Sequence, residues 1–407
     1  MRSTLYARCR PLASLTRKQA QCLTARQIRN ESTVASNDVE QQEVTETTKK
    51  PKRNVVFSGI QPTGVPHLGN YLGALRQWKR LQDDIQKSGS SGKLFFSVVD
   101  LHAITMPQEA AVLRLRRREM MAALLAIGLD PDKSTLFFQS SIPQHAELMW
   151  ILSCTASMGY LSRMTQWKSK LQMHNKAGEL DDATMSKLKL GLFSYPVLQA
   201  ADILVHRATH VPVGEDQRQH LEFARECATN FNHTFKDILI PPETMTTPSR
   251  RVMSLTNPAN KMSKSTPNHR SRILITSTPE EIRTRVMGAV TDSLNAVTYD
   301  PELRPGVANL LELLSQCGLD DSPEARSPEQ LAGQYAGQSL KDLKNDVADA
   351  VCRELRGVRE RYDDFLHRKG GKWLDEIEAE GAEAARHNAE QTMKLVRHAV
   401  GLGPRPT

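Results

Sequence analysis

The chain has 407 residues, of which 39% are hydrophobic and 25% are charged, values typical of a globular protein with a sizeable core. No apolar run approaches the ~20 residues of a membrane helix. None of the six cysteines lies in a C-x-x-C pair. Composition therefore argues against a membrane protein, a zinc ribbon and a disulfide framework.

The first 30 residues hold much of the net charge of +8. They contain seven Arg or Lys side chains and no Asp or Glu. The rest of the protein therefore has 54 − 7 = 47 basic and 46 acidic side chains, a net charge of only +1. An Arg-rich, acid-free start is typical of an organelle transit peptide, although a basic RNA-binding tail has the same composition. We expect residues 1–50 to be a mitochondrial transit peptide followed by a flexible linker, and the protein to work in the matrix.

The next segments alternate between strand and helix patterns. Short apolar runs at 54–58, 94–99 and 134–139 predict buried strands. Between them, a helix carries Leu68, Leu72, Leu75, Trp78 and Leu81 on one face, and a second helix covers 109–127. This alternation predicts an α/β fold with a doubly wound parallel sheet, a Rossmann-like domain over residues 54–276.

The remaining sequence reads mostly as helix. Residues 144–235 have a helical pattern apart from an exposed loop within 167–189, and 252–255 predicts another short strand. After residue 276 the pattern is helical almost throughout, including one long basic helix over 340–367. We therefore expect an all-α C-terminal domain over 277–402.

The first motif with a chemical meaning is Pro62-Thr63-Gly64-Val65-Pro66-His67-Leu68-Gly69-Asn70, directly after the first strand. Gly64 lets the loop turn, and Gly69 allows an adenine or ribose to approach the backbone. The helix start offers N–H groups to phosphate oxygens, and His67 and Asn70 add side-chain donors. A proline-rich turn with a surface histidine is the alternative.

The second motif is Lys261-Met262-Ser263-Lys264-Ser265, in a Ser-rich segment that a proline ends. Two lysines three residues apart suit the charge that develops on pyrophosphate as it leaves a nucleotide. A solvated basic turn has the same composition.

Together these motifs resemble the HIGH and KMSKS signatures of the class I aminoacyl-tRNA synthetases, with Asn70 in place of the final His. Further segments are similar to the tryptophan branch of that family: VDLHAIT at 99–105, RMTQWK at 163–168, YPVLQAADIL at 195–204 and VPVGEDQ at 211–217. The resemblance covers most of residues 54–402. It implies that the C-terminal helical domain reads the anticodon.

The resemblance also implies residue roles on the ATP side. His67, Asn70, Lys261 and Lys264 would be catalytic. The nucleotide would be held by Gln61, Pro62, Thr63, Gly69, Asn70, Gly214, Glu215, Asp216, Val252, Lys261, Met262, Ser263, Lys264 and Ser265. Mg²⁺ would arrive with the ATP phosphates, and no metal site made by protein side chains alone is expected.

On the amino-acid side, Asp202 lies in an otherwise apolar helical stretch, where a carboxylate needs a partner. Pairing with a nearby Arg would satisfy it; the resemblance instead makes it the acceptor for an indole N–H. Tyr195, Gln199 and Asp202 share one helix face by their spacing. The resemblance adds Phe57, His102 and Gln217 to the pocket.

The expected partners are ATP, L-tryptophan, tRNA(Trp) and a second copy of the chain in a homodimer, with neither DNA nor a membrane involved. Two alternatives stay open at this point. The Tyr-x-x-x-Gln-x-x-Asp spacing is also similar to that of the tyrosine enzymes. A synthetase-like protein that binds RNA, for instance in splicing, would share much of the sequence.

Overall fold

A computed structural model of the chain describes residues 54–89, 91–164, 188–214, 217–246, 251–318 and 326–403. The expected transit peptide and linker lie outside the described residues. So do most of the predicted loop at 167–189 and the pair Glu215 and Asp216, to which a ribose-binding role was assigned.

The centre of the fold is a parallel five-stranded sheet in the order β3-β2-β1-β4-β5. Its strands are β1 (Val55–Ile60), β2 (Lys93–Val98), β3 (Thr135–Phe138), β4 (His210–Val213) and β5 (Glu243–Thr246). The chain steps outward from β1 to β3 and then returns to the other side of β1. This reversal places the switch point, where ligands bind in such sheets, between β1 and β4. The predicted fold class is confirmed.

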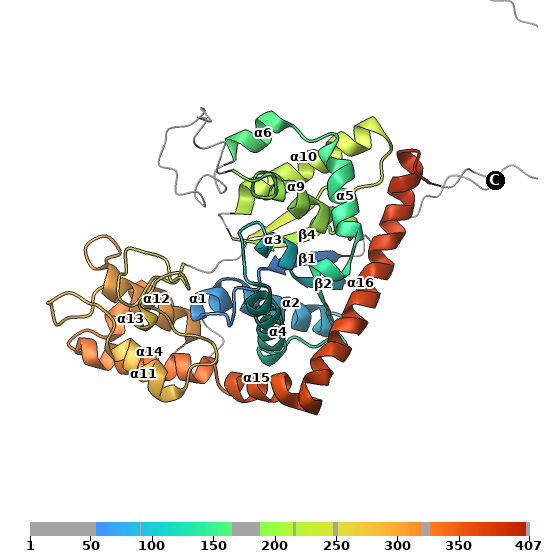
Figure 1. Ribbon diagram of the computed structural model, residues 1–407. Helices are drawn as coiled ribbons and strands as arrows, with labels where there is room; N and C mark the ends of the chain where they lie inside the picture. Colours follow the sequence, from blue (N-terminus) through green and yellow to red (C-terminus); the bar gives the residue numbers. More distant parts are fainter. Residues whose placement is uncertain are drawn as a thin grey trace, which may run out of the picture. The chain divides into compact units, whose positions relative to one another are not determined.

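Alternating side chains on the strands divide the core into two layers. Val56, Phe96 and Phe138 face one layer, and Phe57, Phe95 and Phe137 face the other. Helices cover both faces (Figure 1). The first layer is covered by α1 (Leu68–Asn70), the π-helical turn η1 (Tyr71–Leu75), α2 (Arg76–Lys87) and α4 (Ala110–Ala126). The second is covered by α5 (Gln144–Ser153), α6 (Met158–Arg163), α9 (Leu190–Val205) and α10 (Arg218–Thr234).

The predicted apolar stripe from Leu68 to Leu81 is confirmed, because all five of its side chains are buried. The predicted strand at 252–255 is wrong. That segment forms only an isolated bridge between Met253 and Lys261, and its apolar side chains Val252 and Leu255 are buried in the core. Sequence patterns missed β4 and β5, since β4 contains a proline and β5 is polar.

The predicted single helix over 340–367 is also wrong. The chain forms α14 (Leu340–Glu354) and α15 (Val358–His367), separated at Gly357 by a left-handed backbone with φ of 73°. The positive φ favours glycine at this break, whereas the Arg361 nitrogen 2.8 Å from a Cβ built there ends a flexible side chain that could move aside. The other helices of this region are α11 (Pro279–Met287), α12 (Pro305–Cys317) and α13 (Pro328–Gln334).

The last helix, α16 (Lys372–Ala399), lies along the sheet and not among the helices that precede α15. It runs beside α5 in Figure 1. At Gly381 a Cβ would lie only 1.7 Å from the Leu136 carbonyl oxygen, so the glycine permits direct contact between α16 and β3. Among the described residues, four short elements remain: α3 (Asp100–Ala103) and the 3-10 turns η2 (Gln139–Ser141), η4 (His269–Ser271) and η5 (Arg368–Gly371).

Candidate active site

A cavity of about 500 Å³ opens at the carboxyl ends of β1, β2 and β4, at the switch point of the sheet. β1 and the loop after it supply Phe57 to Gln61, and α9 supplies one helix face. The predicted site residues that line the cavity are Phe57, Gln61, Gly69, Asn70, His102, Tyr195, Asp202, Gly214, Gln217 and Lys261.

The predicted face of α9 is confirmed. Tyr195, Gln199 and Asp202 all line the cavity. The Tyr195 hydroxyl is 2.8 Å from His220 Nε2, and Gln199 Nε2 donates to Gln217 Oε1 at 3.3 Å. These contacts fix two polar side chains on the same wall as the carboxylate.

Asp202 is 1% exposed, and four hydrogen bonds occupy its carboxylate. Oδ2 lies 2.8 Å from His102 Nε2, and Oδ1 lies 2.6 Å from His145 Nδ1. Gln139 Nε2 donates to both oxygens, at 2.7 and 2.9 Å. Burial alone would raise the pKa of Asp202, but the hydrogen bonds from the two histidines lower it below its ordinary value. The pocket therefore contains an ionised carboxylate.

Sequence reasoning missed three members of this network, namely Gln139, His145 and His206. Gln139 follows β3, so its place at the carboxyl end of a parallel strand was a usable signal. His145 is fully buried and hydrogen-bonded to Asp202, a contact that its sequence neighbours do not indicate. His206 ends α9 and is 3.2 Å from His145, a contact that no local pattern indicates.

The HIGH-like segment folds as predicted at its helix start. Gly64 has φ of 86°, which provides the turn. His67 caps α1: its Nδ1 accepts from Asn70 N, and Asn70 Oδ1 accepts from His67 N, each at 3.2 Å. Burial, and then the nearby lysines, lower the pKa of His67 to about 3. His67 is therefore neutral, with its hydrogen on Nε2.

The two motif lysines lie in different surroundings. Lys261 is exposed and lines the cavity. Lys264 Nζ donates to the Gly64 carbonyl at 2.7 Å and to Thr63 Oγ1 at 3.2 Å, so it joins the KMSKS loop to the HIGH-like loop. Burial lowers the pKa of Lys264 to about 8. Ser263 and Ser265 hydrogen-bond to each other at 2.8 Å.

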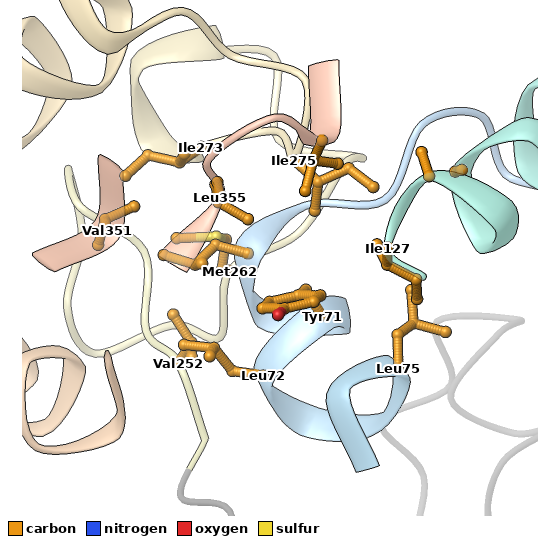
Figure 2. Packing of buried hydrophobic residues seen from close by; sticks show 14 of the residues in the cluster. Tyr71, Leu72, Leu75, Ile127, Val252, Met262, Ile273, Ile275, Val351 and Leu355 are labelled. Carbon is orange, nitrogen blue, oxygen red and sulfur yellow. The ribbon is translucent and has the colours of Figure 1, made fainter. Parts of the chain in front are cut away.

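Met262 anchors the KMSKS loop in the core. Figure 2 shows it among Leu72 of the HIGH-like helix, Val252, and Leu355 beside α14. Its amide also donates to the Val252 carbonyl at 3.0 Å. The loop is thus fixed at Met262, while Lys261 next to it reaches the cavity.

Several predicted residues lie around the cavity without lining it. Val252 packs against Gly69 and Met262 in the core, although it had been placed against adenine. The described residues in this group are Pro62, Thr63, His67, Val252, Met262, Ser263, Lys264 and Ser265.

In the described part of the chain, no group of three or more His, Cys, Asp or Glu side chains is arranged to hold a metal ion. None of the helices in this part has both the length and the apolar character needed to cross a membrane.

The arrangement of a parallel sheet, a HIGH-like helix start and a KMSKS loop defines a class I nucleotide-activating site. Residues 49–356 match the family model for class I tRNA synthetases of the W and Y type. The chain therefore belongs to this family, as the sequence motifs indicated.

Within the family, the chain is most similar to tryptophan enzymes. It is 44% identical over 352 residues to the mitochondrial tryptophan–tRNA ligase of Schizosaccharomyces pombe, covering 85% of this chain and 95% of that protein. The crystal structure of tryptophanyl-tRNA synthetase from Mycoplasma pneumoniae matches with a TM-score of 0.72 at 30% identity, covering 86% of this chain and 98% of the other. The Campylobacter jejuni enzyme, crystallised with ADP and tryptophan, matches with a TM-score of 0.67 at 31% identity, covering 86% and 100%.

Proposed function

We propose that the chain is a tryptophan–tRNA ligase that supplies tryptophanyl-tRNA(Trp) for translation in the mitochondrial matrix. The observation that carries the proposal is a single cavity containing the HIGH-like helix start, a KMSKS lysine and an ionised carboxylate. The similarity to tryptophan enzymes, one of them mitochondrial, supports the choice of amino acid and organelle. The transit peptide at 1–50 is part of the same proposal.

The reaction has two steps. A carboxylate oxygen of tryptophan attacks the α-phosphorus of ATP, the bond from that phosphorus to the bridging oxygen breaks, and pyrophosphate leaves. Mg²⁺ carried by the ATP phosphates would neutralise part of their charge. A hydroxyl of the terminal tRNA ribose, the 2′-OH by family resemblance, then attacks the acyl carbon and releases AMP. Positioning and charge stabilisation supply most of the catalysis.

On the ATP side, Gly69 and Asn70 border the space for the nucleotide, beside Gln61 and Gly214. Lys261 reaches the cavity and would meet the developing charge on pyrophosphate. Lys264, together with Ser263 and Ser265, would close the loop over the triphosphate. His67 would act through its Nε2–H, since Nδ1 caps the helix. Glu215 and Asp216 keep their expected role at the ribose.

On the amino-acid side, Phe57 and Tyr195 would flank the indole, and Gln217 would bind the amino group. The Asp202 carboxylate already accepts four hydrogen bonds, which fill its lone pairs. An indole N–H must therefore share or displace one donor. His102 is the donor that the indole N–H would most readily displace. It lines the cavity, whereas His145 and Gln139 lie behind the carboxylate.

Pyrophosphate exchange with each of tryptophan and tyrosine tests the proposal directly. We expect exchange that depends on tryptophan and exceeds that with tyrosine by several orders of magnitude. Preference for tyrosine would establish the tyrosine alternative. No exchange with either, together with retained RNA binding, would establish the RNA-binding alternative.

The helical region and the oligomeric state are part of the proposal. The helical region expected over 277–402 would contact the anticodon through α11 to α15, while α16 packs against the sheet. Its described surface includes Lys341, Arg356 and Arg359 among other exposed or half-buried basic side chains. A homodimer that shares one tRNA between subunits follows from the family resemblance, and sedimentation with and without tRNA tests it.

A further inference from the structure

A chain of hydrogen bonds runs from the back of the amino-acid pocket to the C-terminal helix. Asp202 Oδ1 contacts His145 Nδ1 at 2.6 Å, and His145 Nε2 contacts His206 Nε2 at 3.2 Å. His206 Nδ1 then contacts Asn388 Oδ1 at 2.8 Å. Asn388 belongs to α16, more than 180 residues from the pocket in sequence. The chain thus connects the proposed indole acceptor to a helix that does not line the cavity.

His206 lies in surroundings that would suit an apolar ring. Its ring centroid is 4.6 Å from that of Phe95 and 5.7 Å from that of Phe57, both stacked, and 5.4 Å from that of Phe137. A polar ring at 1% exposure is costly unless both nitrogens are hydrogen-bonded. Packing alone therefore does not explain a histidine here. Phe57, which stacks on it, also lines the cavity.

The hydrogen atoms along the chain must be arranged consistently. The Asp202 carboxylate only accepts, so His145 Nδ1 carries a hydrogen. One of the two facing Nε2 atoms must then donate to the other. If neutral His206 donates through Nε2, its Nδ1 is an acceptor, and the Asn388 amide must be turned over so that its nitrogen, in place of Oδ1, faces the ring. If His145 donates as an imidazolium, His206 Nδ1–H donates to the Asn388 oxygen. In both arrangements Asn388 completes the chain, because its amide can take either role.

We propose that His145, His206 and Asn388 are positioning residues for amino-acid recognition, which hold the Asp202 carboxylate in the orientation that accepts the indole N–H. Helix α16 is then a functional part of the amino-acid site. The inference rests on the proposed function, and on Asp202 as the acceptor in particular. None of the three residues touches the substrate; each acts through Asp202.

A second set of contacts attaches α16 to helix α5 and provides a control. Arg397 pairs with Glu147 of α5 and with Glu390, and Gln144 donates to Glu390 at 2.9 Å. Glu390→Gln would weaken this attachment of α16 and leave the hydrogen bonds among Asp202, His145, His206 and Asn388 in place. The variant therefore separates the effect of a loosened helix from the effect of losing those hydrogen bonds.

The test compares Asn388→Leu, His206→Phe and Glu390→Gln with wild type in full-length enzyme. Pyrophosphate exchange is measured with tryptophan and with benzothienylalanine, an analogue in which sulfur replaces the indole N–H. Each variant removes a hydrogen bond that helps to orient the Asp202 carboxylate, so Asn388→Leu and His206→Phe should raise KM for tryptophan by up to about tenfold. In both variants, the ratio of kcat/KM for tryptophan to kcat/KM for the sulfur analogue should fall by a similar factor. KM for ATP should not change. Glu390→Gln should keep the wild-type preference.

The outcomes separate the inference from the proposed function. Unchanged preference in folded Asn388→Leu and His206→Phe, with only a lower melting temperature, would overturn the inference and leave the function intact. A change of equal size in Glu390→Gln would also overturn it, since loosening of α16 would then suffice. Wild type without any preference for the indole N–H would overturn the role of Asp202 itself. If Asn388→Leu fails to fold, His206→Phe decides, because its ring suits the aromatic surroundings.

Discussion

The two halves of the proposed site are built in different ways. On the amino-acid side, the Asp202 carboxylate is almost fully buried and is held by His102, His145 and Gln139. On the phosphate side, Lys261 is exposed, and the KMSKS loop is fixed mainly through Met262. The amino-acid side is therefore preorganised before a ligand arrives, whereas the phosphate side has cations that can move toward one. A preorganised pocket suits selectivity for one amino acid. An exposed cation suits the stabilisation of negative charge that develops during the reaction.

The largest effect is expected at Asp202, where the preorganised half would lose its acceptor. Asp202→Ala should lower kcat/KM for tryptophan in pyrophosphate exchange by about 10³- to 10⁴-fold, because a buried site built around a hydrogen bond loses its selectivity without it. The melting temperature should also fall, since the variant leaves His145 and Gln139 as buried donors without their acceptor.

Asp100→Asn is the matched control for this variant. Asp100 is also a buried carboxylate, but it bonds to Arg117 and Ser140 and does not line the cavity. It should lower stability and keep the preference for tryptophan. An Asp202→Ala enzyme that kept its selectivity would remove Asp202 from recognition.

The next largest effect is expected in the phosphate half. Lys261→Ala should slow single-turnover formation of the adenylate by roughly 30- to 1,000-fold, about 2–4 kcal/mol, with little change in tryptophan binding. The reason is that its charge acts when pyrophosphate leaves. Lys236→Ala removes another exposed lysine, outside the cavity, and should retain the wild-type rate. An unchanged rate in Lys261→Ala would exclude the lysine from catalysis.

The comparison of the two halves also shows what could be predicted from the sequence. The phosphate half consists of local segments, and three residues that their motifs single out, Gly69, Asn70 and Lys261, line one cavity. The network around Asp202 joins residues from η2, α3, α5 and α9. No local pattern predicts such contacts, and an isolated histidine is more often structural. The same holds for the fold: the first three strands are apolar runs, while β4 and β5 are recognisable only through their pairing.

A smaller effect concerns stability and pH. Burial lowers the pKa values of His206 and His67 to about 3, below the ordinary value of 6.5. The unfolded chain therefore binds more protons than the folded chain below about pH 6.5, and stability falls as the pH decreases from there toward 3. Between about pH 7.5 and pH 5, each histidine should cost roughly 2 kcal/mol in the free energy of unfolding. The free energy of unfolding, measured in urea at pH 7.5 and pH 5, should fall by roughly 2 kcal/mol less in His206→Phe than in wild type. Equal losses would show that His206 is not kept neutral by burial.

The smallest effect is expected at Gln199, which lies on the cavity wall one turn before Asp202. Its only described side-chain hydrogen bond, to Gln217 Oε1, is long at 3.3 Å, so Gln199→Met should lose little because methionine is similar in size. We expect kcat/KM for tryptophan to stay within about threefold of wild type, because a weak, partly exposed hydrogen bond contributes less than about 1 kcal/mol.

Gln199→Glu is the contrasting variant. It has the same size but places a second carboxylate on the same helix face as Asp202. Like charges in one pocket raise a carboxyl pKa and disturb a site built for a single negative charge, so its loss should exceed that of the Met variant by at least about tenfold. Pyrophosphate exchange with tryptophan and with tyrosine, measured for both variants, tests these expectations. A large gain of tyrosine activity in Gln199→Met would show that Gln199, and not only the Asp202 network, selects the amino acid.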